Sequence, residues 1–78
     1  MHGMLRRELR ESVGARIRRV REAQGLSRHD LMCLSDVPEI MIGMIERGRK
    51  RITLENMLCI ARALERPVME FFSDDEGD

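Results

Sequence analysis

Residues 27–48, with the sequence SRHDLMCLSDVPEIMIGMIERG, hold the pattern that decides the fold. Ser27 is a typical N-cap residue, and Asp30 three residues later favours a helix start because a negative charge is stabilised at that end of a helix. The helix that begins there is expected to end near Asp36, because aspartate is one of the few residues apart from glycine that tolerate a left-handed turn.

A second short helix is predicted directly after this turn. Pro38 suits the first turn of a helix, where its missing N–H is not needed. The helix is expected to run to about Arg47 and to end at Gly48. Two short helices joined by a tight turn over about residues 27–47 form the outline of a helix-turn-helix.

Three further helices are predicted around this segment. One covers about residues 5–24, where Leu5, Leu9, Val13, Ile17 and Val20 form an apolar stripe ended by Gly25. Thr53 caps another over residues 54–64, and Pro67 opens a short one over about 68–73. The predicted fold class is all-α, a compact five-helix domain over residues 1–73, followed by an acidic disordered tail over 74–78.

The predicted core takes apolar residues from each of the four longer helices. We expect the second helix to turn Leu31 and Leu34 inward. The helix over residues 54–64 is apolar nearly all round, which predicts a central position in the core. One buried cluster is expected to contain Ile17, Val20, Leu31, Ile42, Ile45, Leu58, Ala61 and Leu64.

Size and composition narrow the class of protein. The 78 residues suffice for one domain at most. Apolar residues make up 42% of the chain and aromatic residues 3%, with neither Trp nor Tyr, so the usual stacking residues for single-stranded nucleic acid are missing. No apolar run approaches the length that spans a membrane, so we expect a cytoplasmic protein without a membrane partner.

Catalytic and metal chemistry are not indicated. The chain has no nucleophile elbow and no phosphate loop, and it is too small for a substantial substrate pocket, so neither an enzyme nor a cofactor is predicted. Asp30 and Glu46 are interpreted as helix-capping or interhelical partners rather than as catalytic acids. His29 and Cys33 could share a helix face, but a metal site normally needs four ligands, so none is predicted.

Charge is distributed unevenly along the chain, although the net charge is zero. Residues 1–51 carry 12 basic against 7 acidic side chains, a balance of +5, whereas residues 52–78 carry 2 against 7, a balance of −5. This asymmetry predicts one electropositive face and an acidic C-terminal end. Of the 14 basic residues 13 are arginine, which suits bidentate contacts with phosphate and guanine better than lysine does.

The stretch over residues 17–72 resembles the lambda-repressor-like, or Xre and Cro-type, helix-turn-helix family. The matching residues are Ile17-Arg18-Arg19-Val20-Arg21-Glu22-Ala23-Gln24-Gly25-Leu26-Ser27, Leu31, Ile42, Ile45-Glu46-Arg47-Gly48-Arg49, Thr53-Leu54-Glu55, Leu58, Ile60-Ala61-Arg62-Ala63-Leu64, Pro67-Val68 and Phe71-Phe72. The short chain and its Ile52-Thr53-Leu54-Glu55-Asn56 segment are similar to the controller proteins of restriction-modification systems.

The resemblance implies a sequence-specific transcriptional regulator that binds double-stranded DNA, with the second helix of the motif in the major groove. The base-facing positions that it implies are Arg28, Glu39, Ile40, Met41 and Met44. The phosphate-binding positions that it implies are Arg47, Arg49, Lys50 and Arg51, in the loop after that helix. Arginines beside a groove-inserted helix can neutralise phosphates and release counterions, which agrees with this assignment.

The sequence departs from the family pattern in places. The outer face of the second motif helix is largely apolar, whereas relatives commonly have polar residues there. Ile40, Met41 and Met44 therefore leave a second function open, a protein-binding surface on this helix. Met32 replaces a small residue where the two motif helices pack, and Glu65 stands where the family has a helix-ending glycine; both are expected to lower stability modestly.

A homodimer is expected because one module of this size contacts only half of a DNA site. The predicted dimer interface consists of Met69, Phe71 and Phe72 in the last helix. Neighbouring residues on a helix point about 100 degrees apart, so one phenylalanine is expected to enter the core and the other to face the surface. The alternative is that both phenylalanines cover the underside of the monomer core.

Overall fold

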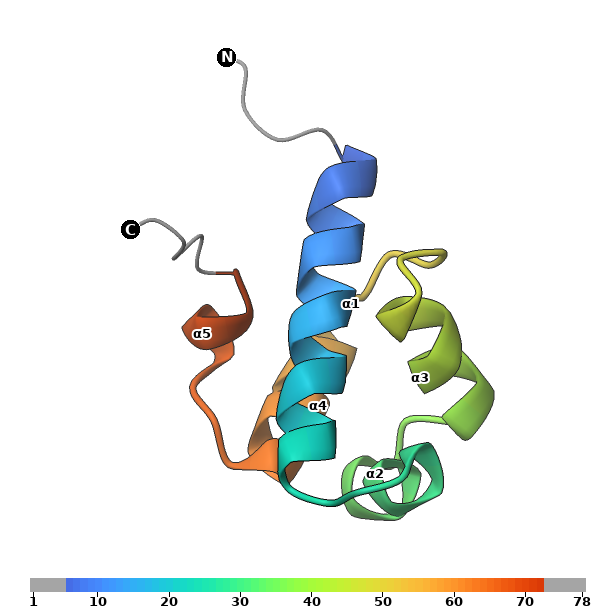
Figure 1. The fold of residues 1–78 in the computed structure, drawn as a ribbon, viewed down its shortest axis with the longest axis vertical. Helices are drawn as coiled ribbons and strands as arrows, with labels where there is room; N and C mark the ends of the chain where they lie inside the picture. Colours follow the sequence, from blue (N-terminus) through green and yellow to red (C-terminus); the bar gives the residue numbers. More distant parts are fainter. Residues whose placement is uncertain (1–5, 73–78) are drawn as a thin grey trace.

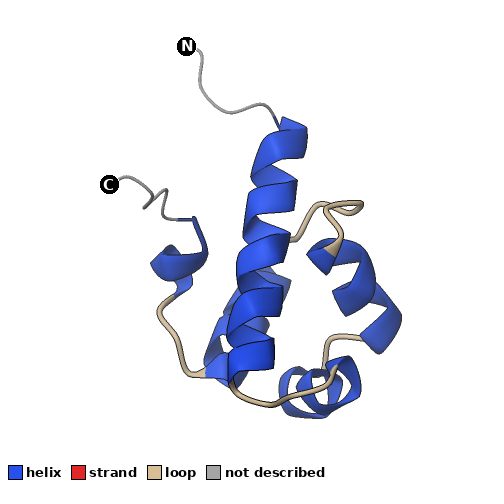
Figure 2. Cartoon of the chain, in the orientation of Figure 1, coloured by secondary structure: helices blue, strands red, loops and turns tan. Residues whose placement is uncertain are grey.

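A long first helix, α1 (Arg6–Ala23), runs through the centre of the fold. The computed structural model describes residues 6–72. In chain order the other elements are α2 (Arg28–Ser35), α3 (Glu39–Glu46), α4 (Leu54–Leu64) and α5 (Val68–Phe72). Within the described residues no strand occurs (Figure 2), so the predicted all-α, five-helix class is confirmed. The predicted tail, residues 74–78, lies outside the described part of the chain.

The helices surround α1 on several sides (Figure 1). α3 and α5 both pack against α1, and Figure 1 shows them on opposite sides of it. α2 lies across one end of the fold and packs against α3 and α4. Among residues 6–72 this arrangement leaves one side of α3 without a neighbouring helix.

The start and end of α2 follow from local chemistry, as predicted. The Ser27 hydroxyl accepts a hydrogen bond from the Asp30 backbone N–H at 2.9 Å, and the Ser27 backbone N–H donates to Asp30 Oδ2 at 2.9 Å. This backbone hydrogen bond, more than any other contact, lowers the pKa of the Asp30 carboxyl. At the other end of α2, Asp36 adopts the expected left-handed conformation with a φ of 65°. The reciprocal pair of bonds satisfies two otherwise free N–H groups.

The ends of α3 and α4 agree with the sequence in most respects. Thr53 caps α4 through its hydroxyl, which accepts from the Asn56 N–H at 3.1 Å. Pro38 is the N-cap of α3 rather than its first helical residue, so α3 begins one residue later than predicted. Glu65 occupies the position that glycine commonly takes, in a left-handed conformation with a φ of 59°, which is strained for a residue with a side chain.

All five helices contribute side chains to the core. Ile17, Leu31, Ile42, Ile45, Ala61 and Leu64 are buried there as predicted, and Val20 packs partly buried against them. The cluster also contains Val13, Val37, Met57, Ile60 and Phe71. The core is thus almost entirely aliphatic, with one phenylalanine.

Two predictions about leucines, those for Leu34 and Leu58, are wrong. Leu34, Leu54 and Leu58 are exposed by 59%, 69% and 50%. α4 turns its Met57, Ile60, Ala61 and Leu64 side to the core. Leu54 and Leu58, four residues apart, lie together on another face, since residues spaced by four share one side of a helix. Among residues 6–72 no further element covers that side.

The two adjacent phenylalanines separate as the helix geometry requires. Phe71 is fully buried, whereas Phe72 is 40% exposed. The alternative in which both cover the core is therefore wrong, and so is the expectation that Phe71 lies at a surface where it could contact a partner. Met69 is 72% exposed.

Candidate nucleic-acid interface

A buried ion pair holds the C-terminal end of α3 against α1. Arg21 donates from Nε to Glu46 Oε2 at 2.6 Å and from Nη2 to Glu46 Oε1 at 3.0 Å. Both side chains are almost inaccessible to solvent. The hydrogen bonds from Arg21 to Glu46 raise the pKa of Arg21 although its burial alone would lower it. Such a bidentate pair sets the position of α3 as well as contributing energy.

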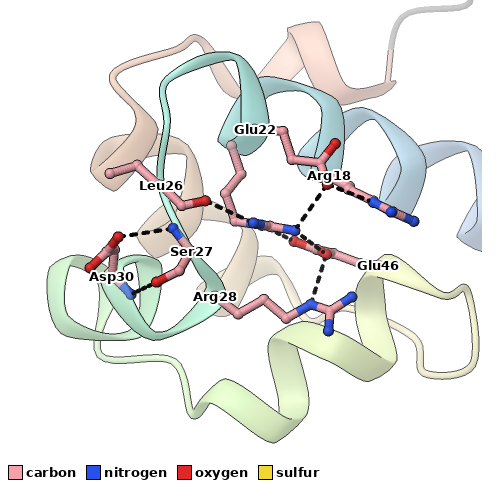
Figure 3. A network of polar contacts seen from close by, with 8 residues as sticks. Arg18, Glu22, Leu26, Ser27, Arg28, Asp30 and Glu46 are labelled. Atoms are coloured by element: carbon pink, nitrogen blue, oxygen red, sulfur yellow. Dashed lines mark hydrogen bonds and ion pairs between the residues drawn. The ribbon is translucent and has the colours of Figure 1, made fainter.

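Arg28 joins the same carboxylate from the first residue of α2, as Figure 3 shows. Its Nε donates to Glu46 Oε1 at 3.1 Å, and its side chain is 34% exposed. Arg21 also donates to the Leu26 carbonyl oxygen at 2.8 Å, in the segment that leads into α2. Glu46 therefore connects α1, α2 and α3. It also holds the Nε atom of Arg28, and with it the guanidinium group, beside α3.

The expected base-facing residues of α3 fall into two groups. Ile40 is 79% exposed and Glu39 is also exposed, with its Oε1 3.4 Å from His29 Nδ1. Met41 and Met44 are only partly exposed. Met41 also has a structural partner, since its sulfur accepts a hydrogen bond from Asn56 Nδ2 at 3.2 Å. The two methionines thus offer less of their side chains to a partner than Ile40 does.

The four basic residues after α3 are all exposed: Arg47, Arg49, Lys50 and Arg51. Among residues 6–72 no carboxylate lies within ion-pair distance of any of them. The carbonyl of Gly48 in this loop accepts from Arg10 Nε at 3.2 Å, so α1 supports the loop. Arg47 lies beside Glu39 and Ile40 on the outer side of α3. Lys50 and Arg51 line a second hollow together with Phe72.

Two residues that position this surface were not identified from the sequence. Gly14 allows α1 to approach the backbone of Ile45 and Glu46 closely, and Arg21 supplies the partner of the buried Glu46. The sequence does contain a feature that points to each of these two residues. A glycine inside a long amphipathic helix commonly has a packing reason, and Arg21 lies one turn after Ile17 on the same side of the helix.

The described residues contain neither a metal-binding group nor a membrane-spanning helix. His29 Nε2 lies 3.7 Å from Cys33 Sγ, so the two side chains do share a face of α2. Over residues 6–72, however, no three His, Cys, Asp or Glu side chains are grouped so that they could hold a metal ion. None of the helices in this range is long and apolar enough to cross a membrane.

Two short helices joined by a tight turn, with one exposed helix face followed by a basic loop that has no carboxylate partner among residues 6–72, define a helix-turn-helix domain. Comparison with known families gives a match to the helix-turn-helix family HTH_3 over residues 17–71. The chain belongs to this helix-turn-helix family of DNA-binding transcriptional regulators.

Known proteins and solved structures support this assignment. The chain is 40% identical over 67 residues to an uncharacterized transcriptional regulator in the ATPase CF(0) region of Rhodospirillum rubrum, a match that covers 85% of this chain and 62% of that protein. The chain thus spans less than two thirds of that relative. The restriction-modification controller protein C.AhdI from Aeromonas hydrophila has a similar structure, with a TM-score of 0.79, 36% identity, and coverage of 81% of this chain and 96% of its own.

A third similar structure is the DNA-binding domain of BldD from S. venezulae. Its TM-score is 0.75 and its identity 29%, with coverage of 85% of this chain and 99% of that domain. The resemblance to the lambda-repressor-like family that the sequence predicts is confirmed by these comparisons.

Proposed function

We propose that this protein binds double-stranded DNA sequence-specifically as a homodimer and thereby regulates transcription. The observation that supports this most is the loop after α3, where four exposed cations have no carboxylate partner among residues 6–72. A groove-inserted helix flanked by such cations can neutralise phosphates on both sides of the groove. Arg47, Arg49, Lys50 and Arg51 are the candidates for these phosphate contacts.

Base recognition would use the exposed side of α3 in the major groove. Arg28 is the strongest hydrogen-bond donor among the expected base-facing residues, and its contact with Glu46 leaves both terminal guanidinium nitrogens for DNA. Glu39 can accept a hydrogen bond from a cytosine amino group, and Ile40 can contact the methyl group of thymine. Met41 and Met44 would add apolar contacts and shape.

The phosphate contacts predict a strong dependence of binding on salt. We expect Arg49→Ala to weaken binding to all duplexes alike. The slope of log affinity against log salt should fall by about one unit for each phosphate that the dimer no longer neutralises. Fluorescence anisotropy with a labelled duplex of random sequence, between about 50 and 200 mM salt, measures this slope.

Arg19→Ala is the matched control for this experiment. Arg19 is an exposed arginine of α1 that lines a hollow with Arg66 and Glu70, on the α5 side of α1 and away from α3. Its replacement should leave the slope unchanged. Equal slopes for wild-type protein and Arg49→Ala would mean that the DNA-binding surface lies elsewhere.

The homodimer is proposed to form through the exposed apolar residues of α5. Met69 and Phe72 are the candidate interface residues. Phe72 lines a largely apolar hollow together with Leu9 and Ile52, and Lys50 and Arg51 lie at the same hollow. Leu9 is itself 43% exposed. A patch of this kind on a two-fold axis is self-complementary.

Phe72→Glu is expected to convert the dimer into a folded monomer, because Phe71 and not Phe72 fills the core. Analytical ultracentrifugation at micromolar concentration measures the change in mass. Leu58→Glu, at an exposed leucine of α4, is the matched control and should remain dimeric. If wild-type protein and Phe72→Glu sediment as the same species, α5 does not form the dimer.

A protein-binding role for α3 is the second candidate, and the 79% exposure of Ile40 favours it. Exposed aliphatic residues commonly mark surfaces that bind other proteins. The salt experiment separates the two functions, since DNA binding weakens steeply with salt and apolar protein binding does not.

A further inference from the structure

Gly43 lies in the middle of α3, where the fold itself gives no reason for glycine. Its φ is not positive, unlike those of Gly25 and Gly48. A Cβ atom added to Gly43 would meet no backbone of another element at short range; its nearest neighbours are three guanidinium atoms of Arg47, at 3.4, 3.5 and 3.7 Å. Glycine is less favourable than alanine inside a helix, so stability alone would select a different residue here.

The side chain of Arg47 covers this glycine. Arg47 follows Gly43 by four residues, and side chains of a helix point back toward its N-terminus. The guanidinium group therefore lies one turn back along α3, over Gly43, instead of extending into the loop. Gly43 is buried beneath it although Arg47 itself is exposed.

The position of this guanidinium differs from that of the other basic residues of the loop. Arg47 lines one hollow together with Arg28, Glu39, Ile40 and Gly43, which are the outer residues of α3 and the arginine beside them. No carboxylate among residues 6–72 pairs with Arg47. The hydrogen-bond donors of the Arg47 guanidinium thus lie beside the α3 residues that would face base edges in the major groove. They do not lie at the edge of the groove, where a phosphate would be.

We propose that Arg47 reads a guanine base in the major groove, and that a side chain longer than a methyl group at position 43 would take the space of the Arg47 guanidinium. This inference rests on the proposed function, since it needs α3 to lie in the groove, and it moves Arg47 from the phosphate-binding to the base-reading residues. Arginine donates two hydrogen bonds to O6 and N7 of guanine, which is the most common specific contact in protein–DNA complexes. The predicted preference is for a G·C pair opposite the middle of α3.

The test begins by selecting the preferred duplex for the wild-type chain of 78 residues from a library of random sequences. Affinities are then measured for the selected duplex, for versions in which single G·C pairs are replaced, and for a duplex of random sequence. We expect Arg47→Ala to bind the selected duplex about tenfold to a hundredfold more weakly, the range that one bidentate base contact supplies. It should also become indifferent to replacement of one particular G·C pair.

Arg49→Ala is the matched control, because it removes an exposed arginine of the same loop. It should lower affinity for the selected and the random duplex by the same factor and reduce the salt slope. If Arg47→Ala behaves in the same way as Arg49→Ala, Arg47 binds phosphate and the inference is wrong.

Gly43→Leu tests the role of the glycine. Leucine is a good helix former, so the variant should melt no lower than wild-type protein, while its side chain occupies the space of the guanidinium. It should lose the same guanine preference as Arg47→Ala, and combining the two changes should weaken binding little further. A Gly43→Leu protein that retains full guanine preference would overturn the inference. If wild-type protein binds no duplex at low salt, the proposed function fails and this inference fails with it.

Discussion

Gly14→Ala is expected to destabilise the folded protein by about 3 kcal/mol or more. A Cβ atom at this position would overlap the carbonyl oxygen of Ile45 and would come within 2.9 Å of the carbonyl oxygen of Glu46. These are backbone atoms at the C-terminal end of α3, so no flexible side chain can move aside. The added methyl group must push α1 away from α3, which opens the core beneath and displaces the helix proposed to enter DNA.

Thermal and urea unfolding followed by circular dichroism measure this effect. For a domain of this size, about 3 kcal/mol corresponds to a fall in Tm of more than about 10 °C. Gly43→Ala is the matched control, because it makes the same chemical change in a helix where the new methyl group meets only a side chain at ordinary contact distance. That variant should unfold at or above the wild-type temperature. Equal stability of Gly14→Ala and wild-type protein would contradict the close approach of α1 and α3.

Arg21→Met is expected to cost about 3–5 kcal/mol, the usual effect of removing one partner of a buried ion pair. The change replaces the arginine by an unbranched apolar side chain and leaves the Glu46 carboxylate, of which only 1% is exposed, with Arg28 as its remaining cationic partner. The Leu26 carbonyl oxygen also loses a donor. The destabilisation arises because a buried charge without adequate hydrogen bonds is poorly tolerated.

A double variant distinguishes this explanation from a simple packing defect. Replacing both partners, as in Arg21→Met with Glu46→Leu, should recover most of the lost stability, because two apolar groups need no partner in the core. Urea unfolding of the single and double variants measures the difference. Arg18→Met breaks the exposed Arg18–Glu22 pair and should change stability by less than about 1 kcal/mol. A double variant no more stable than Arg21→Met would rule out the unpaired carboxylate as the cause.

The helices and their ends could be predicted from the sequence because they depend on residues close together in the chain. Ser27, Asp30 and Thr53 form caps with backbone groups only three residues away. Asp36 takes a left-handed turn for which its own side chain is suited. The apolar spacing along each helix likewise follows from the helical repeat alone. These features need no knowledge of what packs against them.

The assignment of apolar residues to core or surface required the tertiary structure. Leu58 and Met57 are neighbours on an equally apolar helix, yet Met57 is fully buried and Leu58 is half exposed. The direction in which α4 faces depends on where α1, α2 and α5 lie, and no local pattern contains that information. The same holds for Phe71 and Phe72, where the helix repeat predicts that they separate but not which of them enters the core.

The candidate DNA-binding surface depends partly on the sequence alone and partly on the tertiary structure. The sequence alone located the two motif helices, the basic loop from Arg47 to Arg51 and the apolar character of α3. Only the tertiary structure brought Arg21 to Glu46 across 25 residues, attached Arg28 to the same carboxylate and placed the Arg47 guanidinium over Gly43. These contacts depend on the distance and angle between helices, which are set by packing in the core and by the space that a missing side chain leaves at Gly14 and Gly43.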